Sequence, residues 1–324
     1  MRSVSLFSGA MGLDIGLGRA GFETVLAVEK DADCRATIAA NRPNLPLSTD
    51  AMSLQPGDLP ECDIIQGGPP CQPFSTAGAG RGSRDRRFDP FACMLDLIGG
   101  VRPRFVLIEN VRGFLAPKHS ATKEWVFGRL EAFGYSVTAG LYDAADFGVP
   151  QHRSRVLIVG SLSGTVPLMR PTHGGEGLPP WLTLADALRG IEPGAHAEFR
   201  PALVKYLRLV PPGKSWRSLP PDAQRDAMGA AYDSKAGGRS SYYRRLSWER
   251  PCPTVLTSPV QKATPLCHPD HDRPLSVAEY AAVQQFPQDW VFKGSLPSQY
   301  RQIGNAVPVG LGEAIGKHIM AHAH

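Results

Sequence analysis

The feature that most constrains the fold is an alternation of short apolar runs with helical patterns over the first 160 residues. Each run has the length of a buried strand and leads into a polar or glycine-containing turn. Strands that alternate with helices predict a parallel sheet covered on both faces, so we expect an α/β fold. The predicted strands are Val4–Phe7, Thr24–Val28, Asp63–Ile65, Phe105–Ile108 and Arg155–Val159.

Two helices between these strands have recognisable ends. Asp89-Pro90 forms an N-cap and first-turn pair, and apolar residues then recur at helical spacing. We expect Gly99-Gly100 to end this helix. A second helical stripe over residues 126–133 is expected to end at Gly134.

The character of the sequence changes after Gly160. Residues 161–250 are rich in Gly and Pro, and the strand–helix rhythm is lost. Regularity returns with a Ser-x-x-Glu capping box at 276–279, whose helix should end before Pro287, and with a last helix over about 311–320. We therefore predict a larger domain of residues 1–165 plus 274–324 and a smaller, loop-rich domain of residues 166–273.

Positive charge is concentrated in two stretches. Residues 161–250 hold 13 Lys and Arg against 8 Asp and Glu, which accounts for the whole net charge of +5. Four arginines also lie close together within residues 78–88. Such local charge suits a polyphosphate partner, although an ordinary solvated surface is compatible with it.

Neither the cysteines nor the apolar runs indicate export or membrane insertion. The six cysteines form no Cys-x-x-Cys pair, and the apolar runs are too short for a signal sequence or a membrane span. We expect reduced thiols and a cytoplasmic protein. Cys267, His268 and His271 lie close in sequence, but three candidates without a fourth favour a polar loop over a metal site.

The ends of the first two strands indicate an adenosine-type ligand. Ligands of open parallel sheets bind beyond the carboxyl ends of the strands. Here a glycine turn, residues 7–12, follows the first strand, and Glu29 ends the second strand about 20 residues after Gly9. Such an acid can accept hydrogen bonds from two ribose hydroxyls, whether the ligand is a dinucleotide or S-adenosylmethionine. A tight turn that packs a helix on a strand is the alternative.

Cys71 follows two prolines at the end of the third predicted strand. Proline fixes φ and lacks an N–H, so Pro69-Pro70 makes a stiff loop that could hold a nucleophilic thiolate. A small buried core cysteine is the ordinary alternative.

Two further strand ends carry charged residues. Glu109 follows an apolar strand, where a carboxyl is costly without a role or a partner, such as an N-cap or a salt bridge. Arg153 and Arg155 share one face of an extended segment, which could be a solvated strand face or could bind a phosphate or a base carbonyl. Together, a thiol, an acid and an arginine suit attack on carbon 6 of a pyrimidine. The acid would support N3 and the arginine O2, and carbon 5 would then attack a sulfonium methyl.

The order of these motifs resembles that of the DNA (cytosine-5-)-methyltransferase family. The resemblance covers residues 3–160 and roughly 244–318. Its motifs are the Phe-x-Gly-x-x-Gly turn at 7–12, Glu29, Asp50, Gly68–Gln72, Glu109–Val111, Gln151–Arg155, Arg245–Ser247 with Pro253-Thr254, and Arg301–Pro308.

The resemblance implies a Rossmann-like S-adenosylmethionine-dependent methyltransferase fold, mostly parallel, with target recognition in the smaller domain. It implies methyl transfer to carbon 5 of a cytosine flipped out of double-stranded DNA at a specific site, through a covalent bond from Cys71 to carbon 6. Glu109 would bind N3 and the amino group, Arg155 would bind O2, and Arg153 would lie near the thiolate. The expected cofactor contacts are Phe7, Ser8, Gly9, Gly12, Leu13, Glu29, Lys30, Asp50, Ala51, Pro70, Asn305 and Val307. The expected DNA contacts are Arg81, Arg84, Arg86, Arg87, Gln151, Arg239, Arg244 and Arg245.

Two residues depart from the family pattern. Ser5 stands where many members have Asp, and Met11 where many have Gly. Both changes could shift the affinity for the cofactor, and neither removes a catalytic group. We expect a monomer, and we leave open whether a cognate restriction endonuclease acts on the same site.

Three other functions compete with this interpretation. An enzyme of this family that methylates transfer RNA would lack a large recognition region, whereas this chain has about 90 residues in the corresponding place. A catalytically dead DNA-binding regulator would have lost Cys71, Glu109 or Arg155. A nicotinamide-dependent oxidoreductase would account for Gly9 and Glu29 but not for the other three residues.

Overall fold

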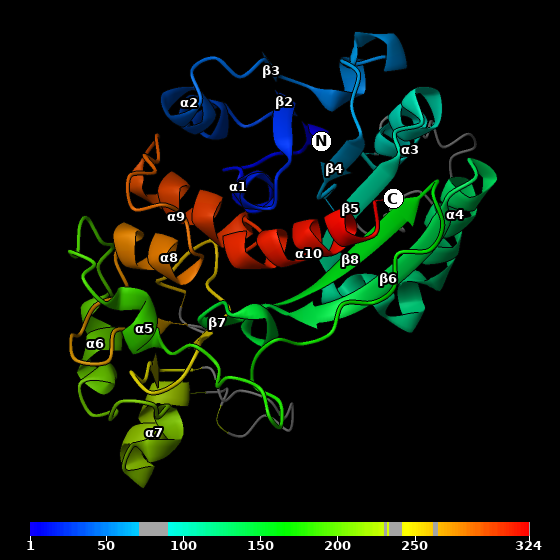
Figure 1. The fold of residues 1–324 in the computed structure, drawn as a ribbon. Coiled ribbons are helices and arrows are strands. Elements are labelled where there is room, and N and C mark those ends of the chain that lie inside the picture. Colours follow the sequence, from blue (N-terminus) through cyan, green and yellow to red (C-terminus); the bar gives the residue numbers. More distant parts are fainter. Residues whose placement is uncertain (71–89, 230–231, 233–241, 262–264, 324) are drawn as a thin grey trace, which may run out of the picture.

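A mixed seven-stranded sheet forms the centre of the protein (Figure 1). The computed structural model describes residues 1–70, 90–229, 232, 242–261 and 265–323. The strand order is β3-β2-β1-β4-β5-β8-β6; the first five pair in parallel, and β8 is antiparallel to both of its neighbours. The strands are β1 (Arg2–Leu6), β2 (Glu23–Val28), β3 (Leu47–Ser48), β4 (Ile64–Gly67), β5 (Phe105–Val111), β6 (Ser136–Asp143) and β8 (Ser154–Ser161).

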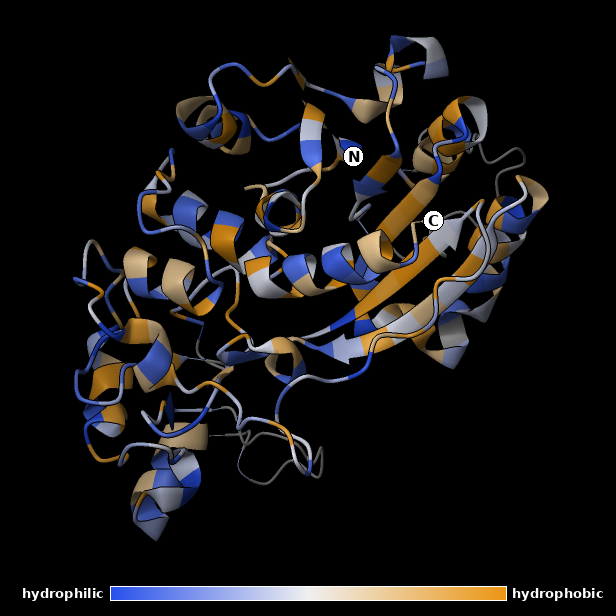
Figure 2. Ribbon diagram, viewed as in Figure 1, coloured by the Kyte–Doolittle hydropathy of each residue, from blue (hydrophilic) through white to orange (hydrophobic). Residues whose placement is uncertain are grey.

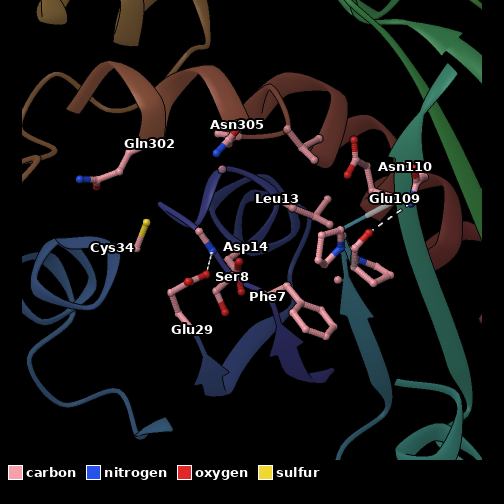
Figure 3. Close-up of a pocket in the computed structure, with 18 of the residues that line it drawn as sticks. Phe7, Ser8, Leu13, Asp14, Glu29, Cys34, Glu109, Asn110, Gln302 and Asn305 are labelled. Atoms are coloured by element: carbon pink, nitrogen blue, oxygen red, sulfur yellow. Dashed lines mark hydrogen bonds between the residues drawn. The ribbon is translucent and has the colours of Figure 1, made fainter. Parts of the chain in front are cut away.

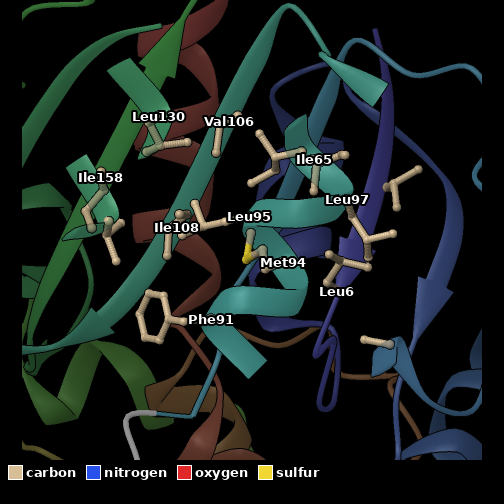
Figure 4. Close-up of a cluster of buried hydrophobic side chains, with 14 of the residues drawn as sticks. Leu6, Ile65, Phe91, Met94, Leu95, Leu97, Val106, Ile108, Leu130 and Ile158 are labelled. Atoms are coloured by element: carbon tan, nitrogen blue, oxygen red, sulfur yellow. The ribbon is translucent and has the colours of Figure 1, made fainter. Parts of the chain in front are cut away.

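Alternate strand residues enter two different hydrophobic cores. Ile65, Val106 and Ile108 face α3 and α4, as Figure 4 shows for the first of these cores. Ile64, Phe105 and their neighbours of the same parity face α1 and α10 on the other side. The sheet is therefore covered on both faces, as the alternating pattern predicts. These helices are α1 (Gly12–Arg19), α3 (Pro90–Val101), α4 (Ser120–Ala132) and α10 (Val309–Ala321).

Most predicted element ends are confirmed, and one is wrong. The helix α4 ends just before Gly134, and Ser276 caps α8 (Val277–Val283) through a capping box with Glu279. Gly99 and Gly100, however, do not end α3, which continues to Val101. A Cβ on either glycine would collide with Phe133 or Pro56, so these glycines serve close packing rather than termination.

Small residues let α1 and α10 lie in direct contact. A Cβ on Gly16 would meet the backbone of α10, and a Cβ on Gly316 would meet Ala20 and Leu17. At the start of α1, a Cβ on Gly12 would meet the carbonyl of Val307. The chain segment before α10 is thereby held against the glycine turn that follows β1.

In the described part of residues 166–273, short helices and two-residue strands take the place of a large sheet (Figure 2). The elements here are α5 (Leu184–Leu188), α6 (Pro201–Leu207), α7 (Pro221–Met228), β9 (Arg244–Arg245), β10 (Cys252–Pro253) and β11 (Leu266–Cys267). Helices α6 and α7 pack around a small hydrophobic cluster that includes Phe199, Leu207 and Tyr243. Leu184 of α5, Cys252 of β10 and Leu266 of β11 instead belong to a core shared with α1 and α8. The boundaries of the two domains stay a prediction.

Three remaining elements lie close to the candidate site. They are α2 (Ala32–Asn41), β7 (Gln151–His152) and α9 (Leu296–Asn305). β7 pairs in parallel with β10, which connects the end of the sheet to the later part of the chain. Among the described residues, no helix has the length and apolar content needed to cross a membrane.

Candidate active site

A cavity of about 450 Å³ lies where the carboxyl ends of four parallel strands meet the connection between α9 and α10 (Figure 3). This is the edge of the sheet at which the sequence predicts a ligand. The volume is in the range of small-molecule sites, roughly 300–1,000 Å³. The lining residues lie within 7–14, 29–34, 66–70, 109–111, 153–155 and 301–307.

The glycine turn after β1 forms one end of the cavity. Phe7, Gly9 and Met11 all have positive φ, at 58°, 55° and 67°, so the backbone turns sharply between β1 and α1. The Glu29 carboxylate accepts hydrogen bonds from the backbone N–H groups of Gly9 and Asp31, each at 2.7 Å. Glu29 is thus fixed at the mouth of the turn, where a carboxylate can bind hydroxyls of a ribose.

Asp14 is a buried carboxyl at this end of the cavity that the sequence reasoning missed. It accepts hydrogen bonds from Gln66 on β4 at 2.9 Å and from Thr24 on β2 at 3.2 Å, and it is also bonded to Ser5. Burial raises its pKa to about 6, and these hydrogen bonds act in the opposite direction. No spacing rule singles out an acid in the first turn of a helix, so only the three-dimensional contacts reveal it.

Glu109 and Arg155 form a buried ion pair at the other end. Oε1 of Glu109 lies 2.7 Å from Nε of Arg155, and each side chain is 13% exposed. Burial raises the pKa of Glu109, and the positive charges of Arg155 and Arg153 only partly oppose the shift. Gly68 leaves room beside the second carboxyl oxygen, since a Cβ there would lie 2.7 Å from Oε2.

Arg153 ties three parts of the chain together beneath the cavity. It is 1% exposed and donates to the carbonyls of Val255 at 3.0 Å and Gly304 at 2.7 Å. Burial, reinforced by the neighbouring Arg155, lowers its pKa to about 9. This guanidinium therefore has a structural role, and its buried Nε–H has no acceptor among the described residues.

The structure brings most of the expected cofactor and catalytic residues together. Lys30, Asp50 and Ala51 do not line the cavity; Lys30 and Asp50 form an exposed ion pair at 3.4 Å beside it. The lining includes Phe7, Ser8, Gly9, Gly12, Leu13, Glu29, Pro70, Glu109, Arg153, Arg155, Asn305 and Val307. Cys71, Arg81, Arg84, Arg86, Arg87 and Arg239 lie outside the described residues.

Two of the expected DNA contacts, Gln151 and Arg245, have buried, hydrogen-bonded side chains in this structure, and their contact with DNA stays a prediction. Gln151 is 0% exposed, donates to Gln284 at 2.7 Å and accepts from the N–H of Val255 at 2.9 Å. Arg245 is 5% exposed and donates to Asp272 and to five backbone carbonyls. Arg244, in contrast, is partly exposed on a groove.

The structure also adds residues to the cavity to which the sequence analysis assigns no role. Asp31 and Cys34 come from the start of α2, and Arg301, Gln302 and Ala306 from the C-terminal motif. The Asn110 side chain donates to the Pro69 carbonyl at 3.2 Å and so connects β5 to the proline loop. Within the described part of the chain, no group of three or more His, Cys, Asp or Glu could hold a metal ion.

The comparisons with known sequences agree on one family. Residues 1–321 match the family described as C-5 cytosine-specific DNA methylase. The Type II methyltransferase M.PspPI of Psychrobacter sp. (strain TA137) is 38% identical over 98% of this chain and 78% of its own length. The Type II methyltransferase M.Sau96I of Staphylococcus aureus is 36% identical over 97% of this chain and 74% of its own length.

Solved structures show the same fold. A DNA modification methyltransferase encoded within a prophage (E. coli) has a TM-score of 0.70 and 25% identity, with 99% of both chains covered. The Dnmt2 methyltransferase of S. pombe has a TM-score of 0.66 and 19% identity over the whole of both chains, a likeness of fold. Because the family matches nearly the whole chain, the chain belongs to the C-5 cytosine-specific DNA methylases, enzymes that methylate cytosine in DNA.

Proposed function

We propose that this enzyme methylates carbon 5 of a cytosine flipped out of double-stranded DNA, with S-adenosylmethionine as the methyl donor and Cys71 as the nucleophile. The observation that carries the proposal is that one cavity contains both a nucleoside-type end and a buried acid–arginine pair. Pro70, the residue before Cys71 in the sequence, lines the same cavity. A thiol there would reach a pyrimidine held by Glu109 and Arg155.

The residues of the first end fit S-adenosylmethionine. The positive-φ glycine turn brings the backbone close to a ligand, and the fixed Glu29 carboxylate suits ribose hydroxyls. Phe7 offers an aromatic face, and Asn305 lies across the cavity from it (Figure 3). Val307 also lines the cavity. When bound, the cofactor would supply an electrophilic methyl group on a sulfonium.

The residues of the second end fit a cytosine. Oε1 of Glu109 is occupied by Arg155, whereas Oε2 faces the space that Gly68 leaves open. Because burial raises its pKa, Glu109 can keep a proton on this oxygen and donate it to N3. Arg155 would then use its remaining N–H donors on the O2 carbonyl.

In the proposed reaction, each bond formed at the pyrimidine is matched by one that breaks. The Cys71 thiolate forms a bond to carbon 6, N3 takes the proton of Glu109, and the electron pair of the double bond makes carbon 5 nucleophilic. Carbon 5 would take the methyl group from the sulfonium of S-adenosylmethionine, whose S–CH3 bond breaks so that S-adenosylhomocysteine leaves as a neutral thioether. Loss of the carbon 5 proton to a base restores the double bond and expels the Cys71 thiolate, and N3 returns its proton to Glu109.

We assign residues 1–165 and 274–324 to catalysis and residues 166–273 to recognition of the DNA site. The large sheet and its cavity lie in the first set, while the second has its own small core. Since the relatives above are named Type II methyltransferases, we further propose a cognate restriction endonuclease that acts on the same site. We propose that the enzyme acts as a monomer on DNA in the cytoplasm.

The covalent step is tested with duplex DNA that carries 5-fluorocytosine in place of cytosine. Fluorine replaces the proton that must leave carbon 5, so the adduct cannot resolve. We expect a band of enzyme joined to DNA on a denaturing gel, dependent on S-adenosylmethionine. The Cys71→Ala variant should give no such band, whereas Cys62→Ala, a partly buried cysteine outside the cavity, should react like the parent. A parent enzyme that methylates DNA without forming this band would contradict the mechanism.

A further inference from the structure

Asp14 is a buried carboxyl that has no cation beside it. It is 5% exposed and lies in the first turn of α1. Glu279, the other acid among the described residues that is buried to this degree, pairs with Arg273 at 2.7 Å. No Lys, Arg or His of the described chain pairs with Asp14 in this way. Its oxygens accept hydrogen bonds only from hydroxyl, amide and backbone donors.

Hydrogen bonds from three strands hold this carboxyl in place. Gln66 on β4 and Thr24 on β2 donate to the same oxygen, and Ser5 on β1 is bonded to the carboxyl as well. The Ser5 hydroxyl accepts in turn from the hydroxyl of Ser8 at 2.9 Å. Because burial raises the pKa of Asp14 only to about 6, the group is largely ionised at neutral pH. Its donors stabilise the negative charge but do not neutralise it.

Asp14 borders the candidate active site between its two ends. Glu29 marks the nucleoside end and Glu109 the pyrimidine end, and Leu13 and Asp14 lie between these two residues in Figure 3. A methyl donor that spans the cavity would keep its ribose at Glu29 while its methyl group reaches the pyrimidine. The sulfur that carries this methyl group would therefore lie in the middle of the cavity, along the wall to which Asp14 belongs.

The charge on this sulfur is what methyl transfer changes. The sulfur is a cationic sulfonium in S-adenosylmethionine and a neutral thioether in S-adenosylhomocysteine, while the adenosine and amino-acid parts are the same in both compounds. An anion close to the sulfur attracts the first compound more than the second, and the attraction is strongest where water is excluded. A buried carboxylate without a cation of its own is therefore suited to distinguish the methyl donor from the spent product.

We propose that Asp14 is a specificity-determining residue that makes the enzyme bind S-adenosylmethionine in preference to S-adenosylhomocysteine. Its carboxylate supplies the negative charge that attracts the sulfonium, and this attraction ends when the sulfur becomes neutral, so the product is held less tightly than the donor. The inference rests on S-adenosylmethionine being the methyl donor, as proposed above. It gives a role to a buried acid that hydrogen bonds to the sheet alone do not require.

Calorimetric titration of the enzyme with each compound measures this preference directly. Asp14→Asn keeps the size of the side chain and the oxygen that accepts from Gln66 and Thr24, but it removes the charge. We expect its affinity for S-adenosylmethionine to fall about tenfold, the lower end of the effect of one opposite charge at close range, while its affinity for S-adenosylhomocysteine stays within about twofold of the parent. Sinefungin, which carries a protonated amine in place of the sulfonium, should lose affinity as S-adenosylmethionine does.

Two control variants separate the charge from the hydrogen bonds and from distant charges. Thr24→Val removes one hydrogen bond to Asp14 and leaves its charge. Glu23→Gln removes an exposed negative charge next to Thr24. Both variants should keep the parent's ratio of the two affinities, and thermal unfolding must show all variants folded.

The preference should also depend on pH in the parent enzyme. Because the pKa of Asp14 is about 6, the ratio of the two affinities should rise as the carboxyl ionises between about pH 5 and pH 7. Other titratable or charged groups surround Asp14 and face both compounds, so the part of this rise that Asp14→Asn abolishes is the part due to Asp14. They are Glu29, Asp31, Cys34, Glu109, Arg153, Arg155 and Arg301 in the cavity, and Glu23 and Arg42 in the surface hollow on the other side of Asp14.

The outcomes separate this inference from the proposed function. If the parent binds both compounds and Asp14→Asn keeps the same ratio of affinities, or if the ratio in the parent does not change with pH, the inference is wrong while the proposed function stands. If the parent binds neither compound and does not methylate DNA with S-adenosylmethionine as the donor, the proposed function itself fails.

Discussion

Two arginine–carboxylate pairs, one in each half of the molecule, differ in the direction of the carboxyl pKa shift, and the carboxylate of the second pair, Asp272, is 34% exposed. Arg155 and Glu109 meet at 2.7 Å at the sheet edge, and Arg245 and Asp272 at 2.6 Å in the loop-rich region. Burial raises the pKa of Glu109 despite its arginine. Burial acts in the same direction on Asp272, but hydrogen bonds from Arg245 and Arg208 outweigh it, so the pKa of Asp272 is lowered.

The difference lies in what surrounds each pair. Arg245 donates its remaining N–H groups to carbonyls of residues 207–210 and 268–271. The pair therefore holds these two segments together and has no donor left for a ligand. Glu109 and Arg155 border a cavity and have capacity left for a ligand. A guanidinium and a carboxylate thus stabilise the fold where all N–H donors are used, and they can bind a ligand where some donors remain free.

The largest effect should come from breaking the loop-rich pair. Arg245→Met would leave a set of buried carbonyls without donors, and we expect a loss of about 3–5 kcal/mol in the free energy of unfolding. Arg208→Ala is the matched control, because it removes only the exposed partner of Asp272 and should cost less than about 1 kcal/mol. Urea denaturation of both variants measures the two losses. Equal losses would mean that Arg245 is no more important than a surface charge.

The pH dependence of stability at this pair follows from the direction in which folding shifts the pKa of Asp272. The pKa of Asp272 is lowered by folding, so its contribution to stability is present above pH 3.8 and is lost as the pH falls through the folded-state pKa. The parent should therefore lose more stability in acid than Arg245→Met does.

A smaller but functional effect should come from the sheet-edge pair. Glu109→Gln keeps the shape and a donor for N3 but cannot transfer a proton, so we expect turnover to fall by at least ~10²-fold with nearly normal DNA binding. Glu131→Gln, an exposed acid on α4, should change neither. A Gln variant within a few-fold of the parent would show that hydrogen bonding suffices.

Folding shifts the pKa of Glu109 upward, opposite to that of Asp272, so activity and stability at this site should fall as the pH rises. The active form of its carboxyl is protonated, so the single-turnover rate should decline as the pH rises through its raised pKa. In Glu109→Gln this descending limb should disappear. Stability follows the same direction, because a raised pKa stabilises the folded state only at low pH and this contribution is lost as the pH rises through the folded value.

The smallest effect should come from an exposed pair. Lys30 is 81% exposed and lies 3.4 Å from Asp50, outside the cavity lining. Lys30→Ala should change stability by about 0–1 kcal/mol and leave S-adenosylmethionine binding within a few-fold of the parent, measured by calorimetry. A loss of tenfold or more in affinity would show that Lys30 contacts the cofactor.

The sequence predicts best what depends on local spacing. The strands from Val4 to Val159 follow from the period of the apolar residues, and the place of Glu29 at the end of the second strand follows from its offset from Gly9; both are found in the structure. The edge strand β6 was missed because its residues 136–140 are all half-buried and show no clear apolar run. Gly99 was misinterpreted because a terminating glycine and a packing glycine look alike without the neighbouring helix.

The same limit applied to the site. Arg244 and Arg245 are adjacent arginines in the sequence, yet the first is partly exposed and the second is buried and enclosed by carbonyls. Their difference is set by a loop 23 to 27 residues further along the chain, which no local pattern encodes. Asp14 and Trp181 likewise acquire their surroundings from distant strands and loops.

The contact between α1 and α10 also determines when the enzyme becomes functional during its synthesis. Residues 301–307 close the cavity, and α10 covers the face of the sheet that Leu13 and Leu17 share. These segments leave the ribosome after every strand of the sheet. A nascent or prematurely terminated chain that stops before residue 301 therefore lacks a wall of its cavity and exposes apolar surface to chaperones and proteases. Incomplete chains of this kind should be degraded rather than left to mark DNA.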